Sequence, residues 1–320
     1  MSISIIGAGA FGTALAVALA QNGPVTLWAR DADHVREMQK TGRNSQRLDG
    51  VDLPENVSVT AEIGRALAPD VILLAIPMQQ TAGFLEQHRT ALAGKLLVSC
   101  SKGIDLATLR GPTALIEEIC PKATPAILTG PSFAADIARG LPTALTLACA
   151  NGEAGSALQA QLSTPVLRLY RSTDPKGAEL GGALKNVIAI AAGVVIGAGL
   201  GDSARAALIT RGFAEMTRLA ERFGGKAETL AGLSGLGDLV LTCTSEQSRN
   251  FRFGATLGRG EIFDPSITVE GAATAKAVSA IALKHAIEMP IAHMVSALVD
   301  QKITVDAAVS ALMSRPLKEE

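Results

Sequence analysis

The feature that most constrains the fold of this chain is a glycine motif near its N-terminus. Residues 7–12 read Gly-Ala-Gly-Ala-Phe-Gly, directly after an apolar run at residues 2–6 and before an Ala-rich helical stretch. At such a junction Gly7 permits a tight turn, Gly9 lets a pyrophosphate approach the backbone, and Gly12 allows the helix to pack closely on the strand. Unpaired N–H groups at the start of the helix then favour phosphate binding. In this context the motif predicts a dinucleotide site.

The residues after the second predicted strand bear on which dinucleotide binds. The strand at residues 25–28 is followed by Ala29, Arg30 and Asp31. An acid at this place usually binds the ribose hydroxyls of NAD, whereas an arginine accommodates the ribose phosphate of NADP. Because Arg30 comes first, we expect NADP (NADPH) to be favoured, while Asp31 keeps NAD open as the alternative.

The first half of the chain alternates short apolar runs with helix-length segments. Continuous β-branched runs of this kind are typical of buried strands in a mainly parallel sheet. Their alternation with helical segments predicts a doubly wound, Rossmann-like α/β domain. The predicted strands cover residues 2–6, 25–28, 57–60, 70–76, 96–100, 126–128, 143–148 and 166–169.

Beyond Tyr170 the strand-like runs end and long Ala-rich amphipathic segments follow, which predicts an all-α C-terminal domain. We place the domain boundary within residues 171–176, with a dinucleotide-binding domain at 1–172 and a helical substrate-binding and catalytic domain at 173–320. The predicted helices cover residues 177–198, 204–223, 274–286 and 305–313.

Composition narrows the classes of partner and site. The formal net charge of −1 gives no reason to expect a nucleic-acid partner. None of the four cysteines forms a CxxC pair or a metal-ligand cluster, so no metal is expected. The longest apolar stretch, residues 187–200, is rich in Ala and Gly and predicts a buried helix rather than a membrane span. Without a recognisable signal peptide, a cytoplasmic location is expected.

A lysine in an apolar helix is the first candidate for chemistry. Lys185 lies in a segment that is apolar on all sides, which indicates a buried helix. A lysine held there should border an internal cleft, where desolvation favours the neutral amine and proton exchange near neutral pH. The glycine-rich turn at residues 232–237 ends in Asp238, an acid that can neutralise and orient such a lysine.

Further polar residues follow in loops. Ser248, Arg249 and Asn250 form a polar triplet in which the arginine can grip a phosphate through two parallel hydrogen bonds. Lys102 leaves the strand at residues 96–100 at its carboxyl end, and residues 130–134 leave the next strand in the same way. Ligands bind at these ends in open α/β sheets.

Six motifs in a fixed order carry a family resemblance over essentially the whole chain. Together they resemble the bacterial NAD(P)-dependent glycerol-3-phosphate dehydrogenases. The motifs are GAGAFGTALA at residues 7–16, SKGI at 101–104, GPSFA at 130–134, LKNVIAIAAG at 184–193, GLSGLGDLVLTCTS at 232–245 and SRN at 248–250.

The resemblance implies reduction of dihydroxyacetone phosphate to sn-glycerol 3-phosphate for phospholipid synthesis, by a homodimer. The catalytic residues that it implies are Lys185 as the acid/base, Asp238 and Lys102. The residues expected to contact the cofactor are Gly7, Gly9, Ala10, Phe11, Gly12, Arg30, Lys102, Ala134, Arg249 and Glu270. The residues expected to contact the substrate are Lys102, Gly130, Ser132, Lys185, Asn186, Asp238, Thr242, Ser248, Arg249 and Asn250.

The chain departs from the family pattern at two places. Ala10 and Phe11 stand where the family often has Ser-Trp, so an indole N–H is absent near the cofactor. Ala272 and Ala273 stand where the family commonly carries an aromatic or charged residue. These changes bear on the rim of the cofactor site and leave the expected chemistry unchanged.

Two other functions remain open at this point. A 3-hydroxyacid or 6-phosphogluconate-type dehydrogenase shares a Lys-Asn helix and this architecture, and it would act on a carboxylate substrate. A non-catalytic dinucleotide sensor would bind the cofactor without turnover. The Gly-Leu-Gly-Asp and Ser-Arg-Asn segments argue against the first alternative, and the combination of Lys185, Asp238 and Arg249 argues against the second.

Overall fold

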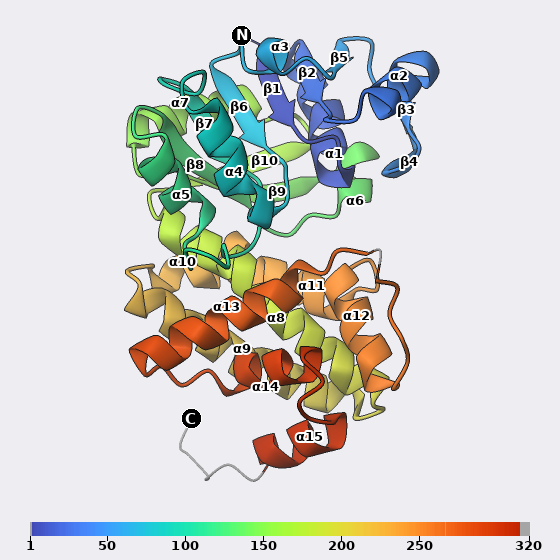
Figure 1. Ribbon diagram of the computed structural model, residues 1–320, viewed down its shortest axis with the longest axis vertical. Helices are drawn as coiled ribbons and strands as arrows, with labels where there is room; N and C mark the ends of the chain where they lie inside the picture. Colours follow the sequence, from blue (N-terminus) through green and yellow to red (C-terminus); the bar gives the residue numbers. More distant parts are fainter. Residues whose placement is uncertain (1, 266, 314–320) are drawn as a thin grey trace. The chain divides into compact units, whose positions relative to one another are not determined.

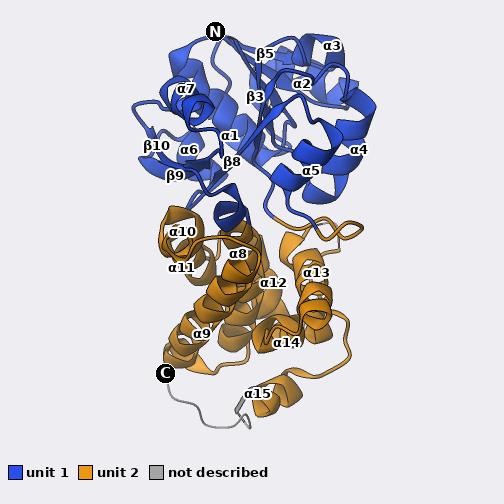
Figure 2. Cartoon of the chain, turned by 90° about the vertical axis from the view of Figure 1, so that its left-hand side faces the viewer, with its two compact units in different colours: residues 1–102, 110–179 blue, residues 103–109, 180–320 orange. Residues whose placement is uncertain are grey.

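The computed structural model describes residues 2–265 and 267–313, and the chain divides into two compact units. Unit 1 comprises residues 1–102 and 110–179, and unit 2 comprises residues 103–109 and 180–320 (Figure 2). Figure 1 shows strands and helices alternating in the first unit and helices alone in the second. The predicted fold class, a Rossmann-like α/β region followed by an all-α region, is confirmed.

Unit 1 contains an eight-stranded sheet with the order β10-β9-β8-β7-β6-β1-β2-β5. Neighbouring strands are parallel except β8 and β9, which are antiparallel. The order changes direction at β1, which pairs with both β2 and β6, so the carboxyl ends of β1 and β6 form a switch point where ligands bind. The strands are β1 Ile3–Ile6, β2 Val25–Trp28, β5 Val57–Thr60, β6 Val71–Leu74, β7 Leu96–Ser99, β8 Thr124–Thr129, β9 Thr143–Ala148 and β10 Leu167–Ser172.

Helices cover both faces of this sheet because successive strand residues point to opposite sides. Ile5 packs in a core with α1, α2 and α7, whereas Ile6 packs in a second core with α3, α4 and α5. Outside the sheet, a two-stranded hairpin that we did not predict joins β3 Arg43–Asn44 to β4 Leu48–Asp52. The helices are α1 Ala10–Leu19, α2 Ala32–Thr41, α3 Ile63–Ala66, α4 Met78–His88, α5 Pro112–Ile119, α6 Ala134–Ala138 and α7 Gly152–Leu162, with a 3-10 turn at Ala20–Asn22.

Unit 2 is built around α8 (Pro175–Gly197), which begins in unit 1. By length and composition α8 could cross a membrane, but 83% of its most apolar window is buried inside the protein, so we interpret it as a core helix. It crosses α12 closely, because a Cβ at Gly254 would overlap the carbonyl oxygen of Ile190. The other helices are α9 Gly201–Arg222, α10 Ala227–Ala231, α11 Asp238–Thr244, α12 Arg249–Gly258, α13 Glu270–His285, α14 Pro290–Val299 and α15 Val305–Met313, with a π-helical turn at Leu233–Gly237.

A buried carboxyl group connects α8 to α5 within unit 1. Glu179 is only 7% exposed, and the backbone N and the Oγ1 of Thr113 donate to its Oε2 at 3.2 and 2.6 Å. Burial raises the pKa of Glu179 to about 7, although the hydrogen bonds from Thr113 act in the opposite direction. The native chain therefore retains at this site a proton that the unfolded chain releases at lower pH.

This proton gives the first prediction. Between the ordinary pKa of 4.5 and about 7, folding keeps Glu179 protonated, so stability falls as pH rises through that window. The loss is on the order of 1 kcal/mol per pH unit. Glu179→Gln retains an acceptor oxygen for Thr113 but does not titrate. We expect the free energy of unfolding of the variant, measured by urea denaturation, to improve relative to wild type from pH 5 to pH 7. Parallel pH profiles for the two proteins would contradict this account.

Candidate active site

The glycine motif forms the connection between β1 and α1. Gly7 has φ of 115°, and a Cβ there would lie 2.5 Å from the carbonyl oxygen of Ala75. A Cβ at Gly12 would overlap the carbonyl oxygen of Gly7, so this glycine allows the helix to approach the turn. The position of a Cβ at Gly9 is open, with nothing within 4 Å. The loop thus has a tight turn, an accessible backbone and a close helix packing, which together fit a dinucleotide pyrophosphate.

The start of α1 suits an anion for a second reason. Its N-cap residue is Gly9, and no side chain caps the helix, so its first N–H groups have no side-chain acceptor. Ala10 and Phe11 begin the helix and are partly buried, and Phe11 packs against the core of unit 1. These features place five of the predicted cofactor residues, Gly7, Gly9, Ala10, Phe11 and Gly12, in one continuous loop and helix turn.

The residues that bear on cofactor choice differ in what they contact. The Oδ1 of Asp31 accepts hydrogen bonds from the backbone N of Asp33 at 2.9 Å and of His34 at 3.3 Å. Asp31 is therefore the N-cap of α2, and its carboxylate is turned toward that helix. Arg30 is exposed at the end of β2. Arg30 and Asp31 are both exposed, but the Asp31 carboxylate is engaged in capping α2.

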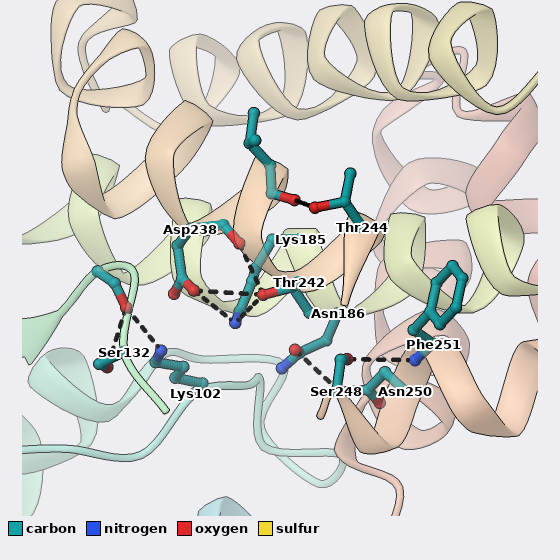
Figure 3. Close-up of polar contacts among 12 residues, drawn as sticks. Lys102, Ser132, Lys185, Asn186, Asp238, Thr242, Thr244, Ser248, Asn250 and Phe251 are labelled. Carbon is teal, nitrogen blue, oxygen red and sulfur yellow. Dashed lines mark hydrogen bonds and ion pairs between the residues drawn. The ribbon is translucent and has the colours of Figure 1, made fainter. Parts of the chain in front are cut away.

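Two predicted substrate loops of unit 1 contact each other. The Nζ of Lys102, after β7, donates to the carbonyl oxygen of Gly130, after β8, at 3.1 Å, and the Oγ of Ser132 donates to the same oxygen at 3.2 Å (Figure 3). Gly130 has φ of 139°, and a Cβ there would lie 3.2 Å from the Cα of Leu145. Ala134, the first residue of α6, follows this turn directly.

Lys185 occupies the centre of a buried polar cluster in unit 2. Its Nζ lies 2.7 Å from Oδ1 of Asp238 and 2.6 Å from Oγ1 of Thr242 (Figure 3). The three residues are 6%, 1% and 2% exposed. Since Thr242 donates its own hydroxyl hydrogen to the carbonyl oxygen of Asp238 at 2.6 Å, its oxygen accepts from Lys185. The pairing favours the ammonium form of Lys185, against the cost of burial.

Close packing of backbones positions this cluster. A Cβ at Gly181 would lie 2.6 Å from the carbonyl oxygen of Ser234, so α8 can approach the π-helical turn only because residue 181 is glycine. Gly181 precedes Lys185 by one helical turn, and both therefore lie on the same face of α8. The π-helical turn leads directly into α11, whose first residue is Asp238. We did not predict this role of Gly181 from the sequence, although the Gly-Gly pair before Lys185 is a signal of it.

A second polar cluster joins α8, α12 and α13. The backbone N of Gly271 donates to Oδ1 of Asn250 at 3.0 Å, and Nδ2 of Asn250 donates to Oδ1 of Asn186 at 2.9 Å. Because the backbone N–H of Gly271 can only donate, the amide oxygen of Asn250 must face it. The amide nitrogen of Asn250 then faces Asn186, so the side chain of Asn186 must direct its oxygen toward Asn250. The amide nitrogen of Asn186 then faces away from the Asn250 amide. Glu270, the first residue of α13, lies beside Gly271.

The start of α12 carries the predicted phosphate residues. The Oγ of Ser248, which is 4% exposed, accepts from the backbone N of Phe251 at 3.2 Å and caps the helix (Figure 3). Arg249 is the first residue of this ten-residue helix and is exposed. A helix start with an adjacent arginine suits a phosphate on both electrostatic and geometric grounds.

The predicted site residues thus fall into clusters within each unit. Unit 1 holds the glycine loop, Arg30 and the contact between Lys102 and Gly130. Unit 2 holds the lysine cluster, the asparagine cluster and the start of α12. One cysteine neighbours the lysine cluster, and burial raises the pKa of Cys243 to about 12, so it remains a thiol.

Comparison with known proteins gives a consistent result along the chain. The family profile described as NAD-dependent glycerol-3-phosphate dehydrogenase N-terminus matches residues 2–155, and the corresponding C-terminus profile matches residues 174–310. A glycerol-3-phosphate dehydrogenase [NAD(P)+] of Ruegeria sp. is 62% identical over 320 residues, with 100% of both chains covered. The protein of the same name from Cereibacter sphaeroides is 64% identical over 318 residues, covering 99% of this chain and 100% of the relative.

A solved structure extends the similarity to three dimensions. The crystal structure of glycerol-3-phosphate dehydrogenase from Coxiella burnetii superposes with a TM-score of 0.93 at 39% sequence identity. The match covers 98% of this chain and 99% of that one. The similarity therefore extends over residues of both units.

Proposed function

Because the chain belongs to the NAD-dependent glycerol-3-phosphate dehydrogenase family and interconverts dihydroxyacetone phosphate and glycerol 3-phosphate, we propose that Lys185 is its acid–base residue. The observation that carries this proposal is the buried contact of its Nζ with Asp238 at 2.7 Å and Thr242 at 2.6 Å. The two acceptors fix the ammonium group in position and favour its charged form. Full-length relatives of this name argue against both the hydroxyacid alternative and the sensor alternative.

The proposed proton transfer uses the chain's own residues. The reduced nicotinamide cofactor, when bound, supplies the hydride for the ketone carbon. The carbonyl oxygen then gains negative charge, which the Lys185 ammonium stabilises and neutralises by donating a proton. Asp238 holds the lysine in place through the contact of its Oδ1 with Nζ at 2.7 Å. Oxidation of glycerol 3-phosphate reverses these steps, with the neutral amine of Lys185 accepting the hydroxyl proton.

We assign the substrate phosphate to the start of α12. Arg249 supplies charge and paired donors, and Ser248 and Asn250 add neutral groups beside the helix N–H groups. The amide nitrogen of Asn186, which the hydrogen bond to its oxygen turns away from Asn250, supports a role as a donor to the substrate. From the family resemblance, Lys102, Gly130 and Ser132 are proposed to complete substrate binding, and Lys102, Ala134, Arg249 and Glu270 to contact the cofactor.

The phosphate assignment gives a prediction for Arg249→Ala. Losing a charge-assisted contact should lower kcat/KM for dihydroxyacetone phosphate by about 10–100-fold. Turnover of unphosphorylated dihydroxyacetone at saturating NADPH should stay unchanged, because that substrate offers no phosphate. Arg252→Ala, an exposed arginine on the same helix, serves as the control. An equal loss with both substrates would remove Arg249 from phosphate recognition.

We propose that NADPH is the preferred cofactor. The proposal is supported by the exposed Arg30 at the end of β2 and by the engagement of Asp31 in capping α2. For Arg30→Ala we expect kcat/KM for NADPH to fall about 10–100-fold, since a ribose phosphate loses its ionic partner. The value for NADH should stay unchanged, as should both values in Arg36→Ala. If the wild-type enzyme turns over faster with NADH than with NADPH at equal concentrations, the proposed preference for NADPH is wrong.

Family membership also supports the proposals for domains, assembly and location. We propose residues 1–172 as the cofactor domain and 173–320 as the substrate and catalytic domain, acting as a cytoplasmic homodimer in glycerophospholipid metabolism. Light scattering during size-exclusion chromatography tests the assembly, since a monomeric mass would contradict it. Following NADPH and NADH oxidation with dihydroxyacetone phosphate tests the activity directly.

A further inference from the structure

An amide buried beside the glycine loop has no part in the site described so far. Asn44, in β3 of the small hairpin, is only 1% exposed. Its Nδ2 donates to the carbonyl oxygen of Ala8 at 3.0 Å and to Oγ1 of Thr13 at 2.7 Å. Its Oδ1 lies 2.8 Å from Nε2 of His34, in α2. One side chain therefore connects the glycine loop, the first turn of α1 and α2.

The chemistry of these partners fixes the orientation of the amide. The carbonyl oxygen of Ala8 can only accept, so the NH₂ group of Asn44 must face it. The oxygen of Asn44 then faces the imidazole, and Nε2 of His34 must carry the hydrogen that it donates. The two N–H hydrogens and the oxygen of the Asn44 amide each form a hydrogen bond, and rotating the amide by 180° would lose these bonds.

The Ala8 carbonyl belongs to the same planar peptide group as the N–H of Gly9. In a trans peptide the C=O and N–H bonds point in opposite directions. Holding the carbonyl oxygen of Ala8 toward Asn44 therefore directs the N–H of Gly9 away from Asn44. The position that a Cβ would take at Gly9 is open, so no protein atom there blocks the approach of the expected pyrophosphate to the backbone.

We propose that Asn44 is a positioning residue for the dinucleotide: it holds the Ala8 carbonyl so that the Gly9 N–H faces the pyrophosphate, and His34 fixes the Asn44 amide. The hydrogen bond from Asn44 to Thr13 holds the first turn of α1 in the same arrangement. His34 extends the network toward the ribose end of the site, because its backbone N donates to Asp31, next to Arg30. The proposal rests on the glycine loop being the cofactor site and not on the role of Lys185.

The test compares two asparagines that make the same kind of contact at opposite ends of one helix. Nδ2 of Asn56 donates to the carbonyl oxygens of Ala20 and Gly23, at 2.6 and 3.0 Å, beyond the C-terminal end of α1. Asn44→Leu and Asn56→Leu each remove such a pair of donors without adding charge. We measure the Kd of NADPH by fluorescence titration, the thermal midpoint, and KM for dihydroxyacetone phosphate at saturating NADPH.

For Asn44→Leu we expect the Kd of NADPH to rise about tenfold or more, as for loss of one buried hydrogen bond. KM for dihydroxyacetone phosphate at saturating NADPH should be unchanged. Asn56→Leu should lose thermal stability and keep the wild-type Kd. If both variants lose stability and both keep the wild-type Kd for NADPH, Asn44 has only a structural role and the proposal is overturned.

Variants of His34 decide the matter if Asn44→Leu does not fold. His34→Leu removes the donor to Asn44 and should raise the Kd of NADPH. His34→Gln supplies an amide N–H in its place and should restore the wild-type Kd. Wild-type NADPH binding by His34→Leu would overturn the proposal. If the wild-type protein turns over while the glycine loop binds neither NADPH nor NADH, the assignment of the glycine loop as the cofactor site is itself wrong.

Discussion

Lys185→Met should reduce kcat for dihydroxyacetone phosphate reduction by about 10⁴-fold, because it removes both proton donation and charge stabilisation at the reacting oxygen. Methionine preserves much of the length and the apolar stem of lysine, so α8 should keep its packing. The variant leaves Asp238 without its ion-pair partner at 2.7 Å, which should also lower stability. The test therefore needs two measurements on the variant: its thermal unfolding, and its steady-state and single-turnover rates of NADPH oxidation.

Cofactor binding separates a chemical role from general damage. The glycine loop and Arg30 lie in unit 1, and Lys185 lies in unit 2, so NADPH should bind to Lys185→Met with its wild-type Kd. Lys176→Met replaces an exposed lysine at the start of the same helix and should retain wild-type kcat. If Lys185→Met turns over within tenfold of wild type, the lysine does not carry the proton.

Asp238→Asn is expected to have the second largest effect. Asparagine has almost the same shape as aspartate but lacks the charge, so the Lys185 ammonium would be buried without its counterion. Removing a nearby negative charge disfavours the ammonium, and kcat for reduction at neutral pH should fall by about 10²-fold. For the same reason the pH–rate profile of reduction should move toward lower pH, where the lysine regains its proton.

The reaction direction provides a control within the same variant. Oxidation of glycerol 3-phosphate needs the neutral amine, so Asp238→Asn should impair oxidation less than reduction at neutral pH. Asp202→Asn, in which an exposed acid of α9 loses its charge, should leave both profiles unchanged. An Asp238→Asn enzyme with a wild-type pH profile would mean that Asp238 does not set the charge of Lys185.

The sequence predicted those parts of the fold that local patterns determine. The apolar runs predicted β1, β2 and the other strands of the main sheet, because buried parallel strands need continuous apolar segments. The hairpin of β3 and β4 was missed, since Arg43 and Asn44 form a strand of only two polar residues. The antiparallel pairing of β8 and β9 could also not be predicted from local sequence patterns, because strand direction depends on contacts between distant segments.

The same distinction applies to the candidate site. Lys185, Asp238 and the glycine loop stand out because their residue types are unusual in their local setting, and the structure joins the first two directly. By contrast, the engagement of Asn250 by the backbone of Gly271 depends on two segments twenty-one positions apart. Asn44 gave no signal in the sequence, because its importance arises only from three partners that the fold brings to it.

Chemical rescue of Lys185→Ala by small primary amines tests the central claim most directly. The alanine leaves a space next to Asp238 and Thr242 that methylamine or ethylamine can enter. We predict that the rate of NADPH oxidation with dihydroxyacetone phosphate rises with amine concentration and varies with amine basicity, as expected for a general acid. A rate that stays the same across the amine series, or wild-type turnover without any amine, would contradict the proposed role of Lys185.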